Sequence, residues 1–158
     1  MMQLLRKRLD REEQGFTLIK LMVVVLIIAI LIAIAIPTFL GARARAQDRA
    51  AQSNLRNALT AEKTYYTDKQ AYSASAVDLQ AIEPSLSYVA STAAATGNGV
   101  FVATADVTAG DKAIVCISAH SASGKDFGMK DVSTGATAGT YYYSGAVTCD
   151  SSAGGASW

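Results

Sequence analysis

The sequence predicts an α+β fold in which one long N-terminal α-helix packs on a small antiparallel β-sheet. Residues 17–68 carry a helical pattern, apolar on every side in its first half and apolar on one side in its second half. After Gln70 the composition changes to Gly, Ser, Thr and Ala, and short β-prone runs alternate with turn residues. Helix first and strands afterwards, with short loops, is the order typical of an α+β domain.

Composition excludes several functional classes. The chain has 158 residues, and 14 Lys and Arg against 13 Asp and Glu leave a net charge of +1. A broadly basic nucleic-acid-binding protein and an acidic disordered chain are both inconsistent with that balance. The hydrophobic share of 51% and the mean hydropathy of +0.22 are high for a soluble domain, so we expect a localised apolar segment.

The apolar segment is found near the N-terminus. Residues 21–42 carry no charge, and the run Leu21–Ile36 consists only of Leu, Met, Val, Ile and Ala. A helix of this length reaches about 33 Å, enough to cross a hydrocarbon layer of about 30 Å. The apolar core of a secretory signal peptide is shorter, and a plain signal anchor is the simplest alternative. Pro37 lies inside the helical pattern, so we expect a kink near it.

Charge alone leaves the orientation of this span open. The positive-inside rule compares the basic residues near the two ends of a span. The counts here are close to equal, with five basic residues before the span and four after it, namely Arg6, Lys7, Arg8, Arg11 and Lys20, then Arg43, Arg45, Arg49 and Arg56.

The second half of the predicted helix is amphipathic. Leu55, Leu59, Glu62 and Tyr66 recur at helical spacing and form a narrow stripe that we expect to face the sheet. A helix of about 50 residues is too long for an ordinary globular element, so its first half requires a membrane or a bundle of partner helices. Charge is also divided, because residues 20–69 carry seven basic and three acidic residues and residues 70–158 carry three and seven. Attraction between copies and chance scatter both explain that division.

Five short runs are candidate strands, and Gly-containing turns separate or flank them. The final Gly-, Ser- and Ala-rich stretch, residues 151–157, is expected to fray. The candidate strands are residues 87–91, 100–105, 113–118, 140–143 and 146–149.

The two cysteines, Cys116 and Cys149, both fall in strand-like runs far beyond the span. A pair of cysteines in an exported domain favours one disulfide, and two buried free thiols in a cytosolic domain are the alternative. A bridge here would stabilise the fold by roughly 3–4 kcal/mol in the chain-entropy model.

Little in the sequence supports catalysis. His120 is the only histidine, so any Ser-His-Asp triad would depend on it, and the nearby Ser121 and Ser123 belong to a Ser-rich loop. Phosphate-loop, dinucleotide-binding and zinc-site spacings are missing. We therefore expect no enzyme, no cofactor and no metal. Four aspartates lack the spacing of a calcium-binding loop and are interpreted as solvated turn residues, namely Asp106, Asp111, Asp126 and Asp131.

The N-terminal residues resemble a known family. The run Gly15-Phe16-Thr17-Leu18-Ile19, followed by an apolar helix with Pro37, strongly resembles the N-terminus of type IV pilins and pseudopilins. The resemblance covers about residues 12–40, and the rest of the chain is similar to the family only in its general pattern and not in specific motifs. It implies three parts: a leader peptide, residues 1–15; a transmembrane and filament-core helix, residues 16–46; and an extracytoplasmic head, residues 47–158.

The resemblance implies a life cycle. A prepilin peptidase would cut after Gly15 on the cytoplasmic side, Phe16 would become N-methylated, and the head would lie outside in a single-pass membrane protein. An assembly ATPase and a platform membrane protein would then build a cell-surface pilus from this and other pilin subunits, for adhesion, motility or DNA uptake. A pseudopilin or minor pilin of a type II secretion-like system is the alternative, and a membrane-anchored binding domain that never polymerises is a third. The acidic head argues against direct contact with nucleic acid.

One residue departs from the family pattern. The fifth residue after the junction is usually Glu, which is thought to meet the N-terminal amine of a neighbouring subunit, and here it is Lys20. Residues 16–47 contain no Asp or Glu. A minor or specialised pilin, a different core arrangement, an altered copy, or a lysine anchor at the membrane boundary would each account for it.

The junction predicts the N-terminus of the mature protein. We expect it to start at Phe16, with a methylated amine, because Gly15 is the residue that the family's peptidase recognises. Mass spectrometry of the intact protein from the cell surface checks this expectation. Surface protein that retains residues 1–15 would contradict it.

Overall fold

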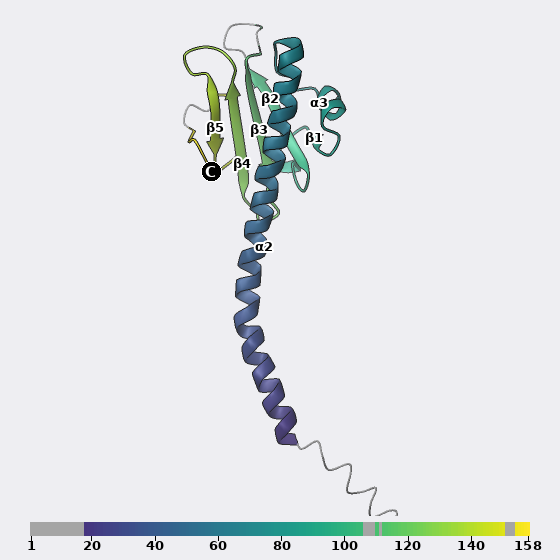
Figure 1. The fold of residues 1–158 in the computed structure, drawn as a ribbon, viewed down its shortest axis with the longest axis vertical. Helices are drawn as coiled ribbons and strands as arrows, with labels where there is room; N and C mark the ends of the chain where they lie inside the picture. Colours follow the sequence, from purple (N-terminus) through teal and green to yellow (C-terminus); the bar gives the residue numbers. More distant parts are fainter. Residues whose placement is uncertain (1–17, 106–109, 111, 151–153) are drawn as a thin grey trace, which may run out of the picture. The chain divides into compact units, whose positions relative to one another are not determined.

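The computed structural model describes residues 18–105, 110, 112–150 and 154–158 (Figure 1). Its compact units divide after Ala42, so that Arg43–Trp158 forms one unit and the apolar part of the first helix belongs to the other. Along the chain, the elements are helix α2 (Leu18–Lys69), helix α3 (Ala76–Ile82), strand β1 (Ser87–Val89), strand β2 (Gly99–Ala105), strand β3 (Ile114–His120), strand β4 (Asp126–Val132) and strand β5 (Gly139–Tyr143).

Helix α2 confirms the predicted long helix to within one residue at each end. The helical backbone continues through Pro37, which has no N–H to donate. The hydroxyl of the next residue, Thr38, donates to the carbonyls of Ile34 and Ala35, at 3.3 and 2.9 Å. The kink near Pro37 stays a prediction. The helix ends where Gln70 adopts a left-handed backbone (φ 55°) while its N–H bonds back to the helix, as at many helix ends.

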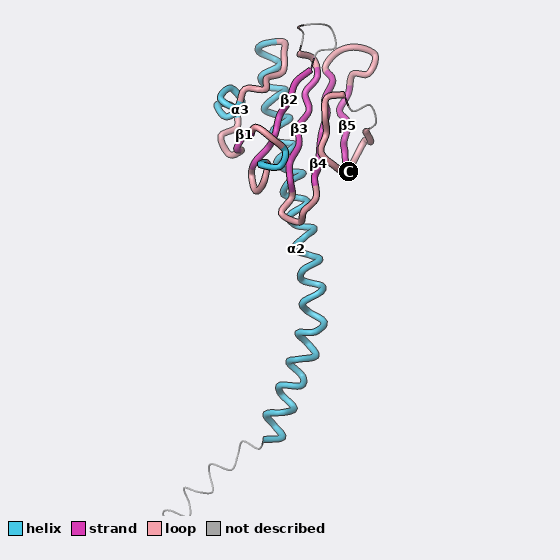
Figure 2. Tube along the Cα trace, turned by 180° about the vertical axis from the view of Figure 1, so that it is seen from behind, coloured by secondary structure: helices cyan, strands magenta, loops and turns pink. Residues whose placement is uncertain are grey.

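The five strands form one sheet in the order β1-β2-β3-β4-β5. Three neighbouring pairs are antiparallel, as predicted, but β1 runs parallel to β2 with Ser87 opposite Gly99. Residues 90–98 return the chain to the same end of the sheet and include a short 3-10 turn, Thr92–Ala94. The part of α2 from Arg43 onward lies across one face of the sheet, which both views of the ribbon show (Figures 1 and 2).

Two of the strand predictions were wrong. Strand β4 was not predicted, because its sequence includes Gly128, Lys130 and two aspartates, which are poor strand formers. Pairing with β3 on one side and β5 on the other stabilises β4 in spite of its low strand propensity. Residues 146–149, predicted as a strand, are instead a loop without ladder pairing.

That loop covers the sheet on the face opposite α2. The Val147 N–H donates to the Ser118 hydroxyl at 3.0 Å, and Val147 is 3% exposed. A Cβ at Gly128 would lie 2.7 Å from the Val147 Cβ, so glycine is required there. The predicted disulfide is confirmed: Cys116 on β3 is bonded to Cys149 at the end of this loop, with Cα atoms 5.4 Å apart.

The core lies between α2 and the sheet. The stripe predicted on the helix is confirmed, because Leu55 and Leu59 are 0% and 7% exposed and pack in one cluster with Ile117 and Met129. Burial of each such side chain stabilises the fold by roughly 1.5–3 kcal/mol.

Two buried aspartates add polar ties between helix and sheet. Asp131 on β4 accepts hydrogen bonds from the Tyr72 and Thr140 hydroxyls and pairs with Lys63 of α2 at 3.0 Å. It therefore joins the helix, the loop after it and β5. Because Asp131 is only 4% exposed, these contacts replace the water that its carboxylate loses.

Asp48 ties the hairpin between β3 and β4 to α2. Its carboxylate accepts from the Ser121 hydroxyl at 2.8 Å, from the Ser123 hydroxyl, and from the Lys125 ammonium at 3.0 Å. These hydrogen bonds, that of Ser123 first, lower the pKa of Asp48 against the opposing effect of its burial. The hydrogen bonds from the hairpin thus stabilise the ionised form of the Asp48 carboxylate.

Asp48→Asn is expected to destabilise the protein by about 1–3 kcal/mol, because the hairpin donors lose a charged acceptor. Thermal unfolding of the full chain in detergent micelles, compared with the exposed Asp68→Asn, measures the effect. Equal stability of the two variants would mean that this carboxylate does not hold the hairpin.

Candidate functional site

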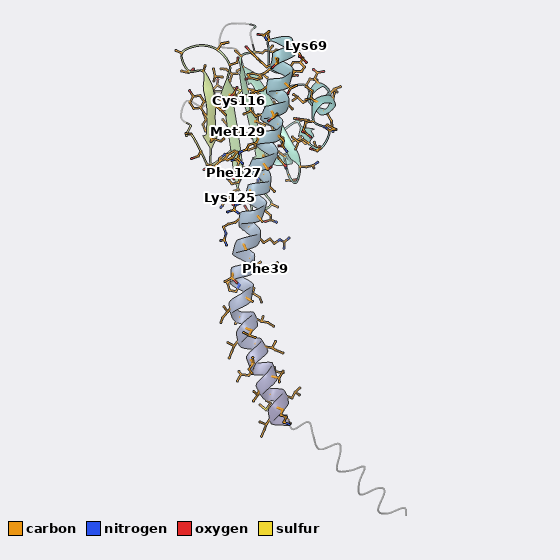
Figure 3. The ribbon with its side chains drawn as sticks, viewed as in Figure 1. Phe39, Lys69, Cys116, Lys125, Phe127 and Met129 are labelled. Atoms are coloured by element: carbon orange, nitrogen blue, oxygen red, sulfur yellow. A yellow bond between two sulfur atoms is a disulfide. The ribbon has the colours of Figure 1, made fainter. Side chains whose placement is uncertain are left out.

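The first part of α2 presents an apolar surface on every side. Each of its large apolar side chains from Leu18 to Leu40 is between 47% and 71% exposed. In Figure 3 the sticks of this part, Phe39 among them, project outward all round the helix. By length and composition, this is the one helix among the described residues that is apolar enough to cross a membrane. Such a surface requires an apolar environment that the chain by itself does not supply.

Two of the residues predicted for assembly lie near the ends of this surface. Lys20 is exposed in the first turn of α2, and Pro37 is exposed near the end of the apolar run. Gly15 and Phe16 lie outside the described residues. The structure therefore places two of the four predicted residues and leaves the processing site as a prediction.

The unit Arg43–Trp158 contains a buried carboxyl group that the sequence analysis placed on the apolar stripe. Glu62 is 0% exposed, and its Oε2 accepts the Ser73 N–H at 3.1 Å. Neither its Oε1 nor the buried hydroxyl of Tyr88 has a hydrogen-bond partner among the residues that the structure describes. An orphaned carboxylate oxygen in a core is costly when it is charged, so the site favours the protonated acid.

The titration of this site follows from its burial. Burial raises the pKa of Glu62 to about 8, and the Ser73 N–H opposes that shift only in part. Burial also raises the pKa of Tyr88 to about 12, with a further contribution from Glu62. The pKa of Tyr72 is raised by burial and by its hydrogen bond to Asp131. The loop and strand that cover Glu62 thus carry neutral groups at neutral pH.

The C-terminus supplies an aromatic contact that sequence reasoning missed. The Trp158 ring packs edge-on against Phe127 of β4 and Tyr142 of β5, and its N–H donates to the Gly128 carbonyl at 3.2 Å. The Arg56 guanidinium of α2 lies 4.9 Å from the ring centre.

A β-bridge near the C-terminus fixes the position of Trp158. Gly155 exchanges both backbone hydrogen bonds with Tyr142, at 2.9 and 3.0 Å, so the prediction that residues 151–157 fray was wrong at Gly155. Only the final tryptophan itself hinted at such a contact, because a large ring rarely stays exposed.

The histidine and serines considered for catalysis form hydrogen bonds with acidic side chains of the fold. His120 Nδ1 lies 2.7 Å from an oxygen of Asp126, while Ser121 and Ser123 bond to Asp48. The serines therefore do not meet the histidine as a triad requires. Among the described residues, no group of three His, Cys, Asp or Glu side chains could hold a metal ion.

Comparison with known proteins finds similarity in the N-terminal region of the chain. Residues 10–36 match the family described as the prokaryotic N-terminal methylation motif. The chain is 38% identical over 66 residues to the type IV major pilin protein PilA of Myxococcus xanthus, a stretch that covers 42% of this chain and 30% of that one. It is also 34% identical over 62 residues to the type IV wide pilus major component PilA4 of Thermus thermophilus, covering 39% of this chain and 47% of that one.

These matches confirm the resemblance to type IV pilins that the sequence indicated. They span less than half of this chain and less than half of each relative. The long helix that continues from the matched motif, together with the mostly antiparallel sheet, gives the chain the pilin-like α+β fold that was predicted.

Glu62 predicts an unusual pH dependence of stability. A carboxyl pKa of about 8 in the folded chain lies above its unfolded value. Its contribution is therefore fully present below pH about 4.5 and is lost as pH rises through about 8. The expected slope is at most about 1.4 kcal/mol per pH unit.

Chemical unfolding of the full chain between these pH values, with native protein and Glu62→Gln compared, measures the slope. The native chain should lose stability relative to Glu62→Gln as pH rises. Parallel stability curves would show that Glu62 titrates normally.

Proposed function

We propose that the chain is a structural subunit of a type IV pilus filament. The observation that carries the proposal is the apolar surface of α2 from Leu18 to Leu40, most of which lies within the matched methylation motif of residues 10–36. The named relatives, a type IV major pilin and a wide-pilus major component, support it. The apolar helices would form the filament core, and the units Arg43–Trp158 would form its surface.

The apolar surface is suited to two environments in turn. A helix without a polar face is stable among lipid chains, where all its backbone hydrogen bonds are internal. The same surface packs against identical helices, since Leu, Ile and Val on one copy contact Leu, Ile and Val on the next. Transfer from membrane to filament therefore requires little change in the helix itself.

The proposed order of events gives a role to the residues predicted for processing and to the two cysteines. A prepilin peptidase cuts after Gly15 on the cytoplasmic side, and Phe16 becomes the methylated N-terminus. The head, with its Cys116–Cys149 bridge, lies on the extracytoplasmic side, where a disulfide persists. An assembly ATPase and a platform membrane protein extract the subunit from the membrane. Adhesion, motility and DNA uptake are the roles open to the resulting filament.

Lys20 favours a second candidate, a pseudopilin or minor pilin of a type II secretion-like system. A subunit that assembles poorly with its own copies but well with others would occupy only part of a filament. The disulfide favours the main candidate.

Electron microscopy of sheared surface fractions, with antibody against the head, distinguishes the candidates. Long filaments labelled along their length support the pilus subunit. Sparse or terminal label supports a minor subunit. An unlabelled fraction, with the chain confined to membranes, would overturn the proposal.

The charge at Lys20 generates a prediction about assembly. In a homopolymer, every copy brings the Phe16 amine and the Lys20 ammonium into one apolar layer, and residues 16–47 offer no carboxylate. Two such charges roughly 5 Å apart repel by about 3 kcal/mol at an effective dielectric near 20.

Lys20→Glu is therefore expected to increase filament mass per cell, and Lys20→Ala to increase it less. A strain that lacks other pilins is required, with cleavage after Gly15 monitored as the control. Abundant native filaments that are lost in Lys20→Glu would contradict this account.

A further inference from the structure

An arginine-rich face lies on the part of α2 that belongs to the unit Arg43–Trp158. Arg45, Arg49 and Arg56 are exposed and share one side of the helix, since their spacings of four and seven are close to one and two helical turns. None of the ion pairs between described residues includes Arg45 or Arg49. We call these three residues the arginine face.

The arginine face borders a groove of about 520 Å³ that contains both polar and apolar groups. Gln52, on the same side of α2, lines it with Trp158, Phe127 and Lys125. Figure 3 places Lys125 and Phe127 beside α2, on the side of the helix where β4 lies. The acids of the groove already have partners: Asp48 pairs with the Lys125 ammonium, and Asp126 lies 2.7 Å from the His120 ring nitrogen. The remaining chemistry of this surface is cationic and aromatic.

A surface of opposite character lies on helix α3. Val77 and Ile82 are 80% and 37% exposed, and they are the exposed large apolar residues of the described part of Arg43–Trp158. Asp78 and Glu83 lie beside them, and neither forms an ion pair with a described residue. These four residues surround the exposed part of α3 and its C-terminal cap, with Ile82 and Asp78 on one side of the helix and Val77 on another. We call them the α3 face.

The two faces lie on opposite sides of the unit. Helix α3 is next to β1, at one edge of the sheet, whereas Trp158 and Arg56 meet β4 and β5 at the other. Figures 1 and 2 show α3 and β5 on opposite sides of α2. One chain therefore cannot join its own two faces, but a second copy can bind to each of them.

We infer that the α3 face of one copy binds the arginine face of the next. Carboxylates would meet arginines, and Ile82, which lies on the same side of α3 as Asp78, would pack near the groove beside Trp158. Because the two faces differ, the contact is head-to-tail and propagates instead of closing into a dimer. The inference rests on the proposed filament and names the surfaces that its outer layer uses. Opposite charges set the register, and like charges oppose the wrong one.

Charge exchange in the full chain tests the pairing. Arg49→Glu and Glu83→Lys should each lower filament mass per cell by about fivefold or more, and the combined variant should recover at least about half of it. Lys69→Glu and Asp150→Lys, which make the same charge changes at exposed sites off both faces, are the matched controls. Equal losses in the controls, or no recovery in the combined variant, would overturn the inference.

Cross-linking separates this inference from the proposed function. A chain with Arg49→Cys and Glu83→Cys, treated on cells with a short bismaleimide, should give a ladder of covalent multimers, whereas Lys69→Cys with Glu83→Cys should not. Filaments without a ladder would overturn the contact and leave the pilus subunit standing. Absence of filaments would overturn both.

Lipid phosphate is the competing partner for the arginines. Arg49→Glu would then release the chain from the membrane fraction, and Glu83→Lys would not alter assembly. That result would also overturn the contact between copies.

Discussion

The structure depends on one unmet requirement, the apolar environment that α2 needs between Leu18 and Leu40. Every large apolar side chain of that segment is at least 47% exposed. At roughly 25 cal/mol per Å² of apolar surface, such a segment is strongly driven out of water. The disulfide-bridged unit Arg43–Trp158, in contrast, buries its own core. The chain therefore combines a part that folds on itself with a part that lipid or other helices must cover.

Three acidic side chains, Asp48, Glu62 and Asp131, add polar contacts to the narrow apolar stripe by which α2 packs on the rest of its unit. Asp48 is held charged by two serine hydroxyls and Lys125, which bind the hairpin to the helix. Asp131 accepts from the Tyr72 and Thr140 hydroxyls and pairs with Lys63, which binds the loop after α2 and β5 to the helix. Glu62 is instead held neutral by burial. Asp48 and Glu62 are thus held in opposite protonation states, because donors lower the pKa of Asp48 and burial raises the pKa of Glu62.

Much of this architecture could be predicted from the sequence, because helical periodicity and composition are local signals. The bounds of α2, the stripe through Leu55 and Leu59, and the Cys116–Cys149 bridge all followed from them. What failed depends on tertiary contacts. Strand β4 is stabilised by two neighbours in spite of poor propensity, and Trp158 is placed by a backbone bridge to Tyr142. The serines that bind Asp48 are more than 70 residues away in sequence, and no local sequence pattern reveals such a contact.

The central claim is that the apolar segment leaves the membrane and is covered by helices of neighbouring subunits. Surface filaments sheared from cells, pelleted without detergent and analysed for phospholipid and for peptides from residues 18–40, test it most directly. The account predicts filaments that contain the whole apolar segment and almost no lipid. Recovery of that segment only from detergent-extracted membranes would contradict it.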